Sequence, residues 1–219
     1  MSEEPSLSLN FYSFGVMLRK REGDTISEYP IDPAHVAVAL ASKVSFTTGL
    51  LTGDTIYIHT EGVSKTVVEY RKPQMTGIFL EGSDAPLRVP LPGLLMLRKT
   101  ANDRVSSYAV FAVKKRPDTF DTPLFQAPLP NVFNSGSVCW GTVQRVSDEA
   151  LSGASLAQDW HQLLGSPFGD HACSGKSKSH PSDIRQKLIE LETKQSRRYP
   201  TTDLLPTRRT LAHLLEVEV

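Results

Sequence analysis

The sequence changes character at residues 129–141, which read LPNVFNSGSVCWG. Before this stretch, short runs rich in β-branched and aromatic residues are each bounded by Gly, Pro, Asn or Asp, the usual pattern of strands. After it, apolar residues recur at helical spacing. Strands first and helices afterwards predict an α+β fold, in which the two kinds of element are segregated along the chain.

The strand-like runs before residue 129 follow one another at short, regular intervals. They cover residues 55–60, 65–71, 76–81, 94–98 and 107–114. No long helical pattern separates these runs, so we expect them to form an antiparallel meander. Residues 89–93, which read VPLPG, are expected to form a rigid turn at an edge of the sheet.

The first forty residues predict a hairpin followed by a short helix. The hairpin consists of residues 7–19 and 25–29, joined by the charged turn KREGD. Asp32 and Pro33 have the residue types favoured at the N-cap and first position of a helix. We therefore expect a largely buried helix over residues 34–43.

Three helices are expected after Cys139. Leu156, Trp160, Leu163 and Leu164 lie on one face of the first, which Ser155 caps and Gly165 ends. Ser182 caps a second helix that runs to about Arg197. Thr207 caps a last short helix carrying Leu211, Leu214 and Leu215. The polar residues 165–181 are expected to form an exposed loop.

The overall composition excludes several classes of protein. Twenty-four basic and 24 acidic residues balance to zero, so no electrostatic footprint for nucleic acid or an anionic membrane is present. No apolar run approaches the roughly 20 residues that span a bilayer. The acidic start of the chain does not resemble a signal peptide. Two cysteines are too few for a disulfide framework, which predicts a reducing, cytoplasmic location.

Cys139 and Asn131 are suited to thioester chemistry. The cysteine follows the asparagine by eight residues, with an Asn-Ser-Gly turn between them. That turn can fold the chain back and bring the amide toward the thiol, and Gly136 allows a tight reversal. A free thiol has a pKa of ~8.5, so only a small fraction is the reactive thiolate at neutral pH.

The segment from Leu129 to Cys139 resembles the active-site segment of ubiquitin-conjugating enzymes, in which a His-Pro-Asn triplet precedes the catalytic cysteine by the same eight residues. It is most similar to a prokaryotic branch, protein B of the PRTRC cassette (ParB-related, ThiF-related). Members of that branch share the Pro-Asn-Val-aromatic run and Cys-Trp-Gly. The resemblance covers about residues 85–195.

This resemblance implies a ubiquitin-conjugating-enzyme-like antiparallel β-meander followed by C-terminal helices. Residues 85–219 would form this core, and residues 1–84 a β-rich N-terminal extension. Cys139 would accept a ubiquitin-like protein from a ThiF-like activating enzyme and pass it to an amine. Other cassette proteins are expected partners, and no cofactor or metal is expected.

The resemblance also assigns roles to residues around the thiol. The side-chain amide of Asn131 would donate a hydrogen bond to the developing oxyanion, a role worth ~2.7–4 kcal/mol where measured. Four further residues would support the turn and loop, namely Pro130, Asn134, Gly136 and Trp140.

Two departures from the family pattern keep a second interpretation open. Leu129 replaces the histidine, and Trp140-Gly141 replaces a Leu-Asp pair. No motif selects a residue to receive the amine proton, although Asp148 and Asp159 are candidates. The alternative is a catalytically inactive binding or scaffold module, which holds a ubiquitin-like protein or other proteins of a plasmid- or mobile-element-encoded cassette.

Other patterns are weaker. A lone cysteine is commonly a buried structural residue, and this remains the alternative for Cys139. The Gly-Lys-Ser at residues 175–177 lacks the other features of a P-loop. The spacing of Cys173 and its neighbouring histidines fits no standard zinc pattern. A papain-type thiol hydrolase ranks last, because its histidine lies much farther downstream than His161 or His171.

Overall fold

The computed structural model describes residues 6–41, 44–102, 104–141 and 155–216. The chain divides into two compact units. The first consists of Met1–Phe46 with Glu61–Val63, and the second of Thr47–Thr60 with Ser64–Val219. None of the described helices is long and apolar enough to cross a membrane.

The first unit is a three-stranded antiparallel sheet followed by a helix. Its strands β1 (Leu7–Tyr12), β2 (Gly15–Glu22) and β3 (Thr25–Ile31) pair in chain order. The prediction of one strand over residues 7–19 is wrong, because the chain turns before Gly15. Gly15 adopts a φ of 150°, a backbone conformation that residues with a side chain rarely adopt.

Helix α1 (Pro33–Ala41) begins where the sequence predicts. The Asp32 carboxylate accepts a hydrogen bond from the Ala34 backbone amide at 2.8 Å, which confirms the N-cap. The expectation of a largely buried helix is wrong, because Val36 is its only buried residue.

The second unit is built on a seven-stranded sheet. Its strands lie in the order β12-β11-β10-β9-β6-β5-β4, so that neighbours in the sheet follow chain order except at one insertion. The strands are β4 (Ser45–Thr47), β5 (Thr55–Glu61), β6 (Ser64–Arg71), β9 (Gly93–Ala101), β10 (Arg104–Val113), β11 (Pro123–Gln126) and β12 (Pro206–Thr210).

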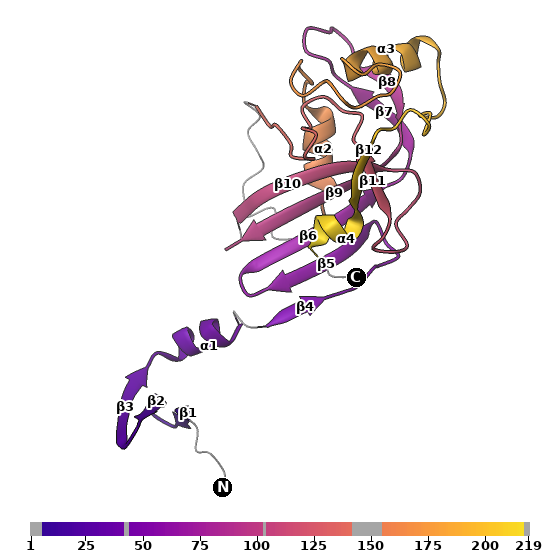
Figure 1. The fold of residues 1–219 in the computed structure, drawn as a ribbon. Coiled ribbons are helices and arrows are strands. Elements are labelled where there is room, and N and C mark those ends of the chain that lie inside the picture. Colours follow the sequence, from indigo (N-terminus) through magenta and orange to yellow (C-terminus); the bar gives the residue numbers. More distant parts are fainter. Residues whose placement is uncertain (1–5, 42–43, 103, 142–154, 217–219) are drawn as a thin grey trace. The chain divides into compact units, whose positions relative to one another are not determined.

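The insertion between β6 and β9 is a separate two-stranded antiparallel sheet (Figure 1). It pairs β7 (Gln74–Ile78) with β8 (Leu87–Leu91). Residues 89–91 therefore lie in a strand, and the expected turn over 89–93 is wrong. The sequence strands at 55–60, 65–71, 94–98 and 107–114 are confirmed.

In the described residues after 141 there are three helices, as the sequence predicts, with shifted ends. They are α2 (Ala157–Gly165), α3 (Ile184–Thr193) and α4 (Leu211–Leu215). Asp183, rather than Ser182, caps α3 by accepting a hydrogen bond from the Arg185 amide at 2.9 Å. Thr210, the last residue of β12, begins α4 in a capping box with His213. The predicted cap, Thr207, is wrong and lies three residues earlier in that strand.

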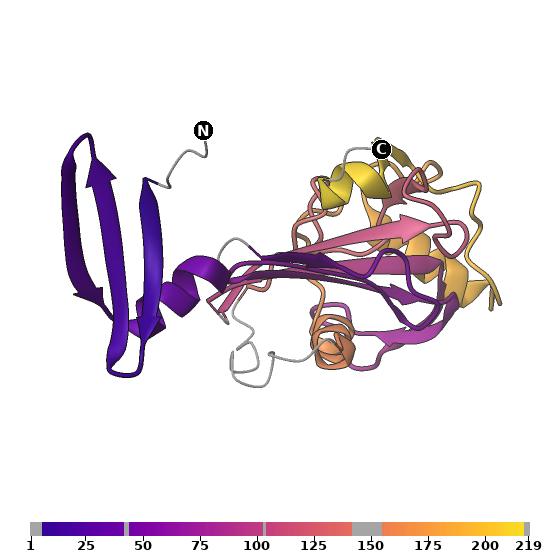
Figure 2. The ribbon, with the colours of Figure 1, turned by 90° about the horizontal axis from the view of Figure 1, so that it is seen from below.

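Side chains on alternating positions of the central strands face opposite sides of the sheet and enter two hydrophobic clusters. On β9, Leu94 and Met96 belong to one cluster, and Leu95 and Leu97 to the other. Figure 2 shows α2 and α4 on opposite faces of the sheet. Burial on both faces explains the uninterrupted apolar run at the start of β9.

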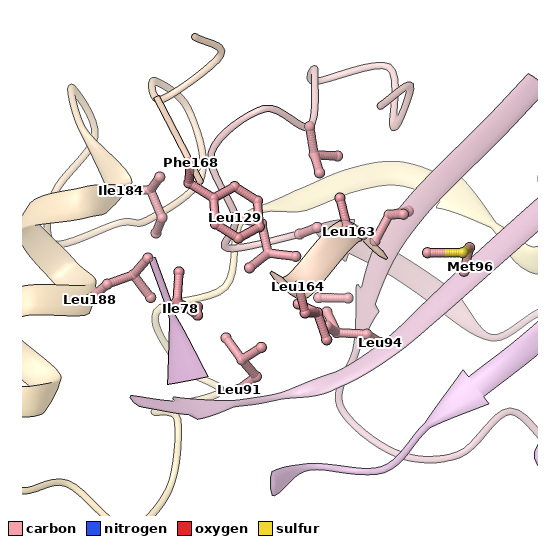
Figure 3. Packing of buried hydrophobic residues seen from close by; sticks show 14 of the residues in the cluster. Ile78, Leu91, Leu94, Met96, Leu129, Leu163, Leu164, Phe168, Ile184 and Leu188 are labelled. Atoms are coloured by element: carbon pink, nitrogen blue, oxygen red, sulfur yellow. The ribbon is translucent and has the colours of Figure 1, made fainter. Parts of the chain in front are cut away.

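The larger cluster also joins the helices to the loops around residues 129 and 168. Leu129, Leu163 and Phe168 point into it together with residues from β7, β8 and α3 (Figure 3). A buried ion pair adds a polar link between sheet and helix. Arg98 on β9 donates to the Asp159 carboxylate on α2 at 2.8 Å, and both side chains are 1% exposed.

The fold is α+β and rich in β-structure, with antiparallel strand pairing and helices near the C-terminus. The boundary expected at residue 84 stays a prediction. Strands on both sides of it share one sheet, because β6 pairs with β9 from Arg71 opposite Leu94 to Ser64 opposite Ala101.

Candidate active site

Residues 131–139 form a small β-hairpin. The backbone amide of Cys139 donates to the carbonyl of Asn131 at 2.7 Å, and Phe133 donates to Ser137 at 2.8 Å. Val132 and Val138 face each other between these bonds. The eight-residue spacing therefore brings the backbones of Asn131 and Cys139 together, as the Asn-Ser-Gly turn led us to expect.

The hairpin is anchored to the sheet through Gly136. Its carbonyl accepts a hydrogen bond from Val110 of β10 at 2.8 Å, and it adopts a φ of 94°. A Cβ atom here would lie 2.3 Å from Cζ of Phe111, so the turn passes directly over that ring. Only glycine meets both requirements.

Asn131 joins the hairpin to the loop after α2. Its backbone amide donates to the carbonyl of His171 at 2.9 Å, and its Nδ2 donates to the carbonyl of Pro167 at 3.4 Å. Its Oδ1 atom is buried and has no hydrogen-bond partner among the described residues. An unsatisfied acceptor of this kind costs about 1–3 kcal/mol, so a ligand donor would be favoured there.

Cys139 lines a cavity of about 370 Å³, and its side chain is partly exposed. Asn131 and Trp140 line the same cavity, as do Glu81 and His171. The cavity therefore combines a thiol, an amide, a carboxylate and an imidazole.

Gly169 allows three of these side chains to approach one another. A Cβ atom at this position would lie 2.9 Å from Oε2 of Glu81 and 3.9 Å from Oδ1 of Asn131. The Cδ2 atom of His171 is 3.8 Å from the same point. A side chain larger than glycine would therefore occupy the space where the carboxylate, amide and imidazole meet.

Glu81 and His171 have no signal in the sequence that marks them as cavity residues. The chain brings them to Cys139 through backbone pairing between segments far apart. Phe168 donates to the carbonyl of Phe79, and Glu81 donates to the carbonyl of Phe168, at 2.7 and 2.9 Å. His171 lies only 32 residues beyond Cys139 in the sequence, yet it lines the same cavity as the thiol.

Of the two aspartates considered as proton acceptors, Asp159 is described, and it does not line the cavity. Asp148 lies outside the described residues. Asp159 is buried against Arg98 and also accepts a hydrogen bond from the Tyr108 hydroxyl. Tyr108 in turn packs edge-on against Trp140, with ring centroids 5.0 Å apart. Asp159 thus supports, through Tyr108, the position of Trp140, which lines the cavity.

Lys176 also supports the hairpin. Its side chain is fully buried, and its Nζ atom donates to the carbonyl of Val132. Val132 and Val138 face each other without bonding directly, so the Val132 carbonyl is free to accept this bond. Burial lowers the pKa of Lys176 from 10.5 to about 8.

The remaining residues expected to support the loop occupy different environments. Pro130 is buried, and Trp140 is partly buried against Tyr108. Asn134 is exposed at the turn, where its carbonyl accepts a hydrogen bond from Nε2 of Gln126 at 3.0 Å. The side chain of Leu129, which replaces the family's histidine, lies in the hydrophobic cluster.

The second thiol has a different setting. Cys173 is buried, and its Sγ atom lies 3.6 Å from the carbonyl of Gly169. Burial raises the pKa of this thiol, which keeps it protonated and poorly nucleophilic. Within the part of the chain that the structure describes, no group of His, Cys, Asp and Glu side chains is arranged to hold a metal ion.

Comparison with known proteins identifies the family. A family model described as prokaryotic E2 family D matches residues 36–207, well over half of the chain. The match includes the hairpin, the cavity residues and Lys176. No curated protein and no solved structure matches the sequence. The chain therefore belongs to prokaryotic E2 family D, a ubiquitin-conjugating-like family.

Proposed function

We propose that this protein is a thioester carrier, which accepts a ubiquitin-like protein on Cys139 and transfers it to an amine. The observation that carries the proposal is the cavity of about 370 Å³ that Cys139 shares with Asn131, Glu81 and His171. A partly exposed thiol beside polar side chains fits a nucleophile better than a structural cysteine. Cys173 provides the contrasting case within the same chain.

Loading is a thioester exchange. The Cys139 thiolate attacks the acyl carbon of a ubiquitin-like protein held as a thioester on a ThiF-like activating enzyme. The new carbon–sulfur bond forms as the old one breaks, and the activating enzyme recovers its thiolate. The acyl group remains activated, because a thiolate is a good leaving group.

Discharge is aminolysis of that thioester. The amine nitrogen attacks the acyl carbon and forms a tetrahedral intermediate with an oxyanion. The amide of Asn131 is the proposed donor to this oxyanion, and it would have to exchange its long bond to the Pro167 carbonyl. Its unpartnered Oδ1 is equally suited to accept a hydrogen bond from the amine.

The amine must lose a proton before the amide product leaves Cys139. Among the described lining residues of the cavity, Glu81 and His171 are the two side chains that can accept it. Expulsion of the Cys139 thiolate then completes transfer. This assignment fills the role for which sequence motifs selected no residue.

The proposed partners are a ThiF-like activating enzyme, a ubiquitin-like protein and other proteins of a PRTRC-type cassette. The resemblance of residues 129–141 to the PRTRC branch supports this setting. The free thiol that the reaction needs favours the reducing cytoplasm. The second candidate is a binding or scaffold module of the same cassette without transfer activity, which Leu129 in place of histidine favours.

Loading distinguishes these functions. The full chain is mixed with ATP, the ThiF-like protein encoded beside its gene and a candidate ubiquitin-like protein, and the products are separated with and without reductant. We expect a reductant-sensitive conjugate. Cys139→Ala should abolish it, Cys139→Ser should give a reductant-resistant ester, and Cys173→Ala should load normally.

Two results would count against the carrier. If the activating enzyme charges itself and the chain only co-purifies with the ubiquitin-like protein, the scaffold function is favoured. If Cys173→Ala abolishes the conjugate and Cys139→Ala does not, the reactive thiol is the buried one and the proposed site is incorrect.

A further inference from the structure

A second cavity, of about 530 Å³, lies at one end of the seven-stranded sheet. It shares no lining residue with the Cys139 cavity. Its charged lining residues are all cationic, namely Lys72, Lys114, Arg197 and Arg198.

The sheet topology explains how two of these cations meet. Lys72 follows the end of β6, and Lys114 follows the end of β10. Both strands are antiparallel to β9, which lies between them and begins at Gly93. Lys72 and Lys114 therefore emerge at the same end of the sheet. The segment after α3 brings Arg197 and Arg198 to the same place.

These four cations are concentrated in a chain whose formal net charge is zero. All four are exposed, and none forms an ion pair with another described residue. Lys114 instead lies over the ring of Phe125, with Nζ 4.8 Å from the centroid. A local excess of positive charge attracts an anionic ligand.

The cavity is not a simple phosphate cradle. Its cations come from three separate segments, and its lining includes no helix N-terminus, the usual feature of a phosphate site. Pro90, Leu91 and Pro92 give it an apolar wall. Distributed cations beside an apolar wall match several carboxylates spaced along an extended chain, with an apolar side chain among them.

We propose that this cavity binds an acidic segment of a partner protein, with Arg197 and Arg198 pairing with its carboxylates and the Pro90–Pro92 wall contacting an apolar residue. The site does not require Cys139 chemistry. Its occupation would bring a second protein to the carrier while the thiol cavity remains accessible.

The test is binding of a fluorescein-labelled peptide, Asp-Glu-Leu-Asp-Glu-Phe-Asp-Glu, to the full chain, followed by fluorescence anisotropy. The matched neutral probe is Asn-Gln-Leu-Asn-Gln-Phe-Asn-Gln. We expect the acidic peptide to bind more tightly and to weaken as salt is raised, because exposed charge pairs are screened. Equal affinities for the two peptides would overturn the proposal.

Charge reversal locates the site. Arg197→Glu with Arg198→Glu should weaken the acidic peptide about tenfold, since two exposed pairs are lost and replaced by repulsion. The control reverses two exposed cations elsewhere, Lys178→Glu with Arg208→Glu, and gives the same net charge. An equal loss in the control would mean that only overall charge matters, and the site would be excluded.

Two further arms complete the test. Lys72→Gln with Lys114→Gln removes charge without introducing a new one, and it should also weaken binding. This variant tests the site if a charge-reversal variant folds poorly. Inorganic phosphate and ATP are added as competitors. Displacement of the peptide by ATP at concentrations where equal ionic strength of NaCl has no effect would identify a phosphate ligand and overturn the acidic-segment proposal.

Discussion

The Nζ atom of Lys176 donates a hydrogen bond to the carbonyl of Val132 inside the hairpin that carries Cys139. The lysine side chain is 0% exposed, so an ammonium group that is usually solvated is buried beside the hairpin. The pair links the loop after α2 to the hairpin, and it stabilises the segment that carries Asn131 and Cys139.

The buried lysine should make stability depend on pH. Its folded-state pKa is about 8 and its ordinary value is 10.5, so the unfolded chain binds more protons between these values. The free energy of unfolding therefore rises with pH across this window, by about 2 kcal/mol from pH 8 to 9.5. Lys176→Met should lose this rise.

Urea denaturation of the native chain and Lys176→Met at several pH values measures the difference. Burial and the neighbouring Asp203 raise the pKa of Tyr199, which lowers stability at high pH, but this contribution is common to both chains and cancels. Parallel stability curves over pH 8–9.5 would show that Lys176 titrates normally in the folded protein.

Gly136 should tolerate no side chain. Gly136→Ala would place a methyl group 2.3 Å from the Phe111 ring and would hold alanine at a φ of 94°. We expect a loss of about 2–4 kcal/mol, from overpacking and backbone strain together. Gly141→Ala is the control, because its φ of 55° is also positive but no atom lies within 4 Å of the new methyl group.

Thermal and urea unfolding of the two variants separate the cost of the positive φ from the cost of the methyl contact with Phe111. A loss confined to about 1–2 kcal/mol in both would mean that only the positive φ matters. A larger loss in Gly136→Ala alone would support the close approach of the turn to Phe111, and it would indicate that this contact fixes the hairpin on β10.

Asp159 should be a structural residue rather than the acceptor of the amine proton. Asp159→Asn leaves Arg98 buried beside a neutral amide, and loss of one partner of a buried pair costs about 3–5 kcal/mol. Asp118→Asn, in the exposed pair with Lys115, should leave stability nearly unchanged, because water screens that pair. Normal stability of Asp159→Asn with slow discharge would reverse this assignment.

The strands that the sequence predicted are those with long apolar or alternating runs. The β9 sequence Leu-Leu-Met-Leu is apolar because both faces of the sheet are covered, and this signal is strong. Strands β11 and β12 were missed because they are short and each begins with proline. Their pairing depends on a contact between residues more than eighty positions apart, which local propensity does not report.

The candidate site, too, could be predicted from the sequence only in part. The Asn131–Cys139 hairpin follows from local turn chemistry, and the sequence was sufficient to predict it. Glu81, His171 and Lys176 reach the site only through tertiary packing. A lysine in a polar Gly/Ser-rich segment predicts an exposed loop, yet Lys176 is buried because a hairpin carbonyl provides its acceptor.

Glu81 and His171 should affect discharge more than loading, because only the amine must lose a proton. If one of them is the base, its replacement by glutamine should slow transfer to lysine by about a hundredfold and leave formation of the Cys139 thioester intact. Single-turnover discharge of the loaded protein, for Glu81→Gln and His171→Gln separately, identifies which side chain acts. Glu22→Gln, an exposed residue of β2, is the matched control.

Hydroxylamine separates proton transfer from positioning. It is uncharged at neutral pH and needs less help from a base than the lysine ammonium, so the base variant should discharge to hydroxylamine at nearly the native rate. A variant that is equally slow with both nucleophiles has lost the geometry of the cavity rather than a base. If both variants discharge to lysine at the native rate, neither Glu81 nor His171 takes the proton, and the acceptor lies outside the described lining of the cavity.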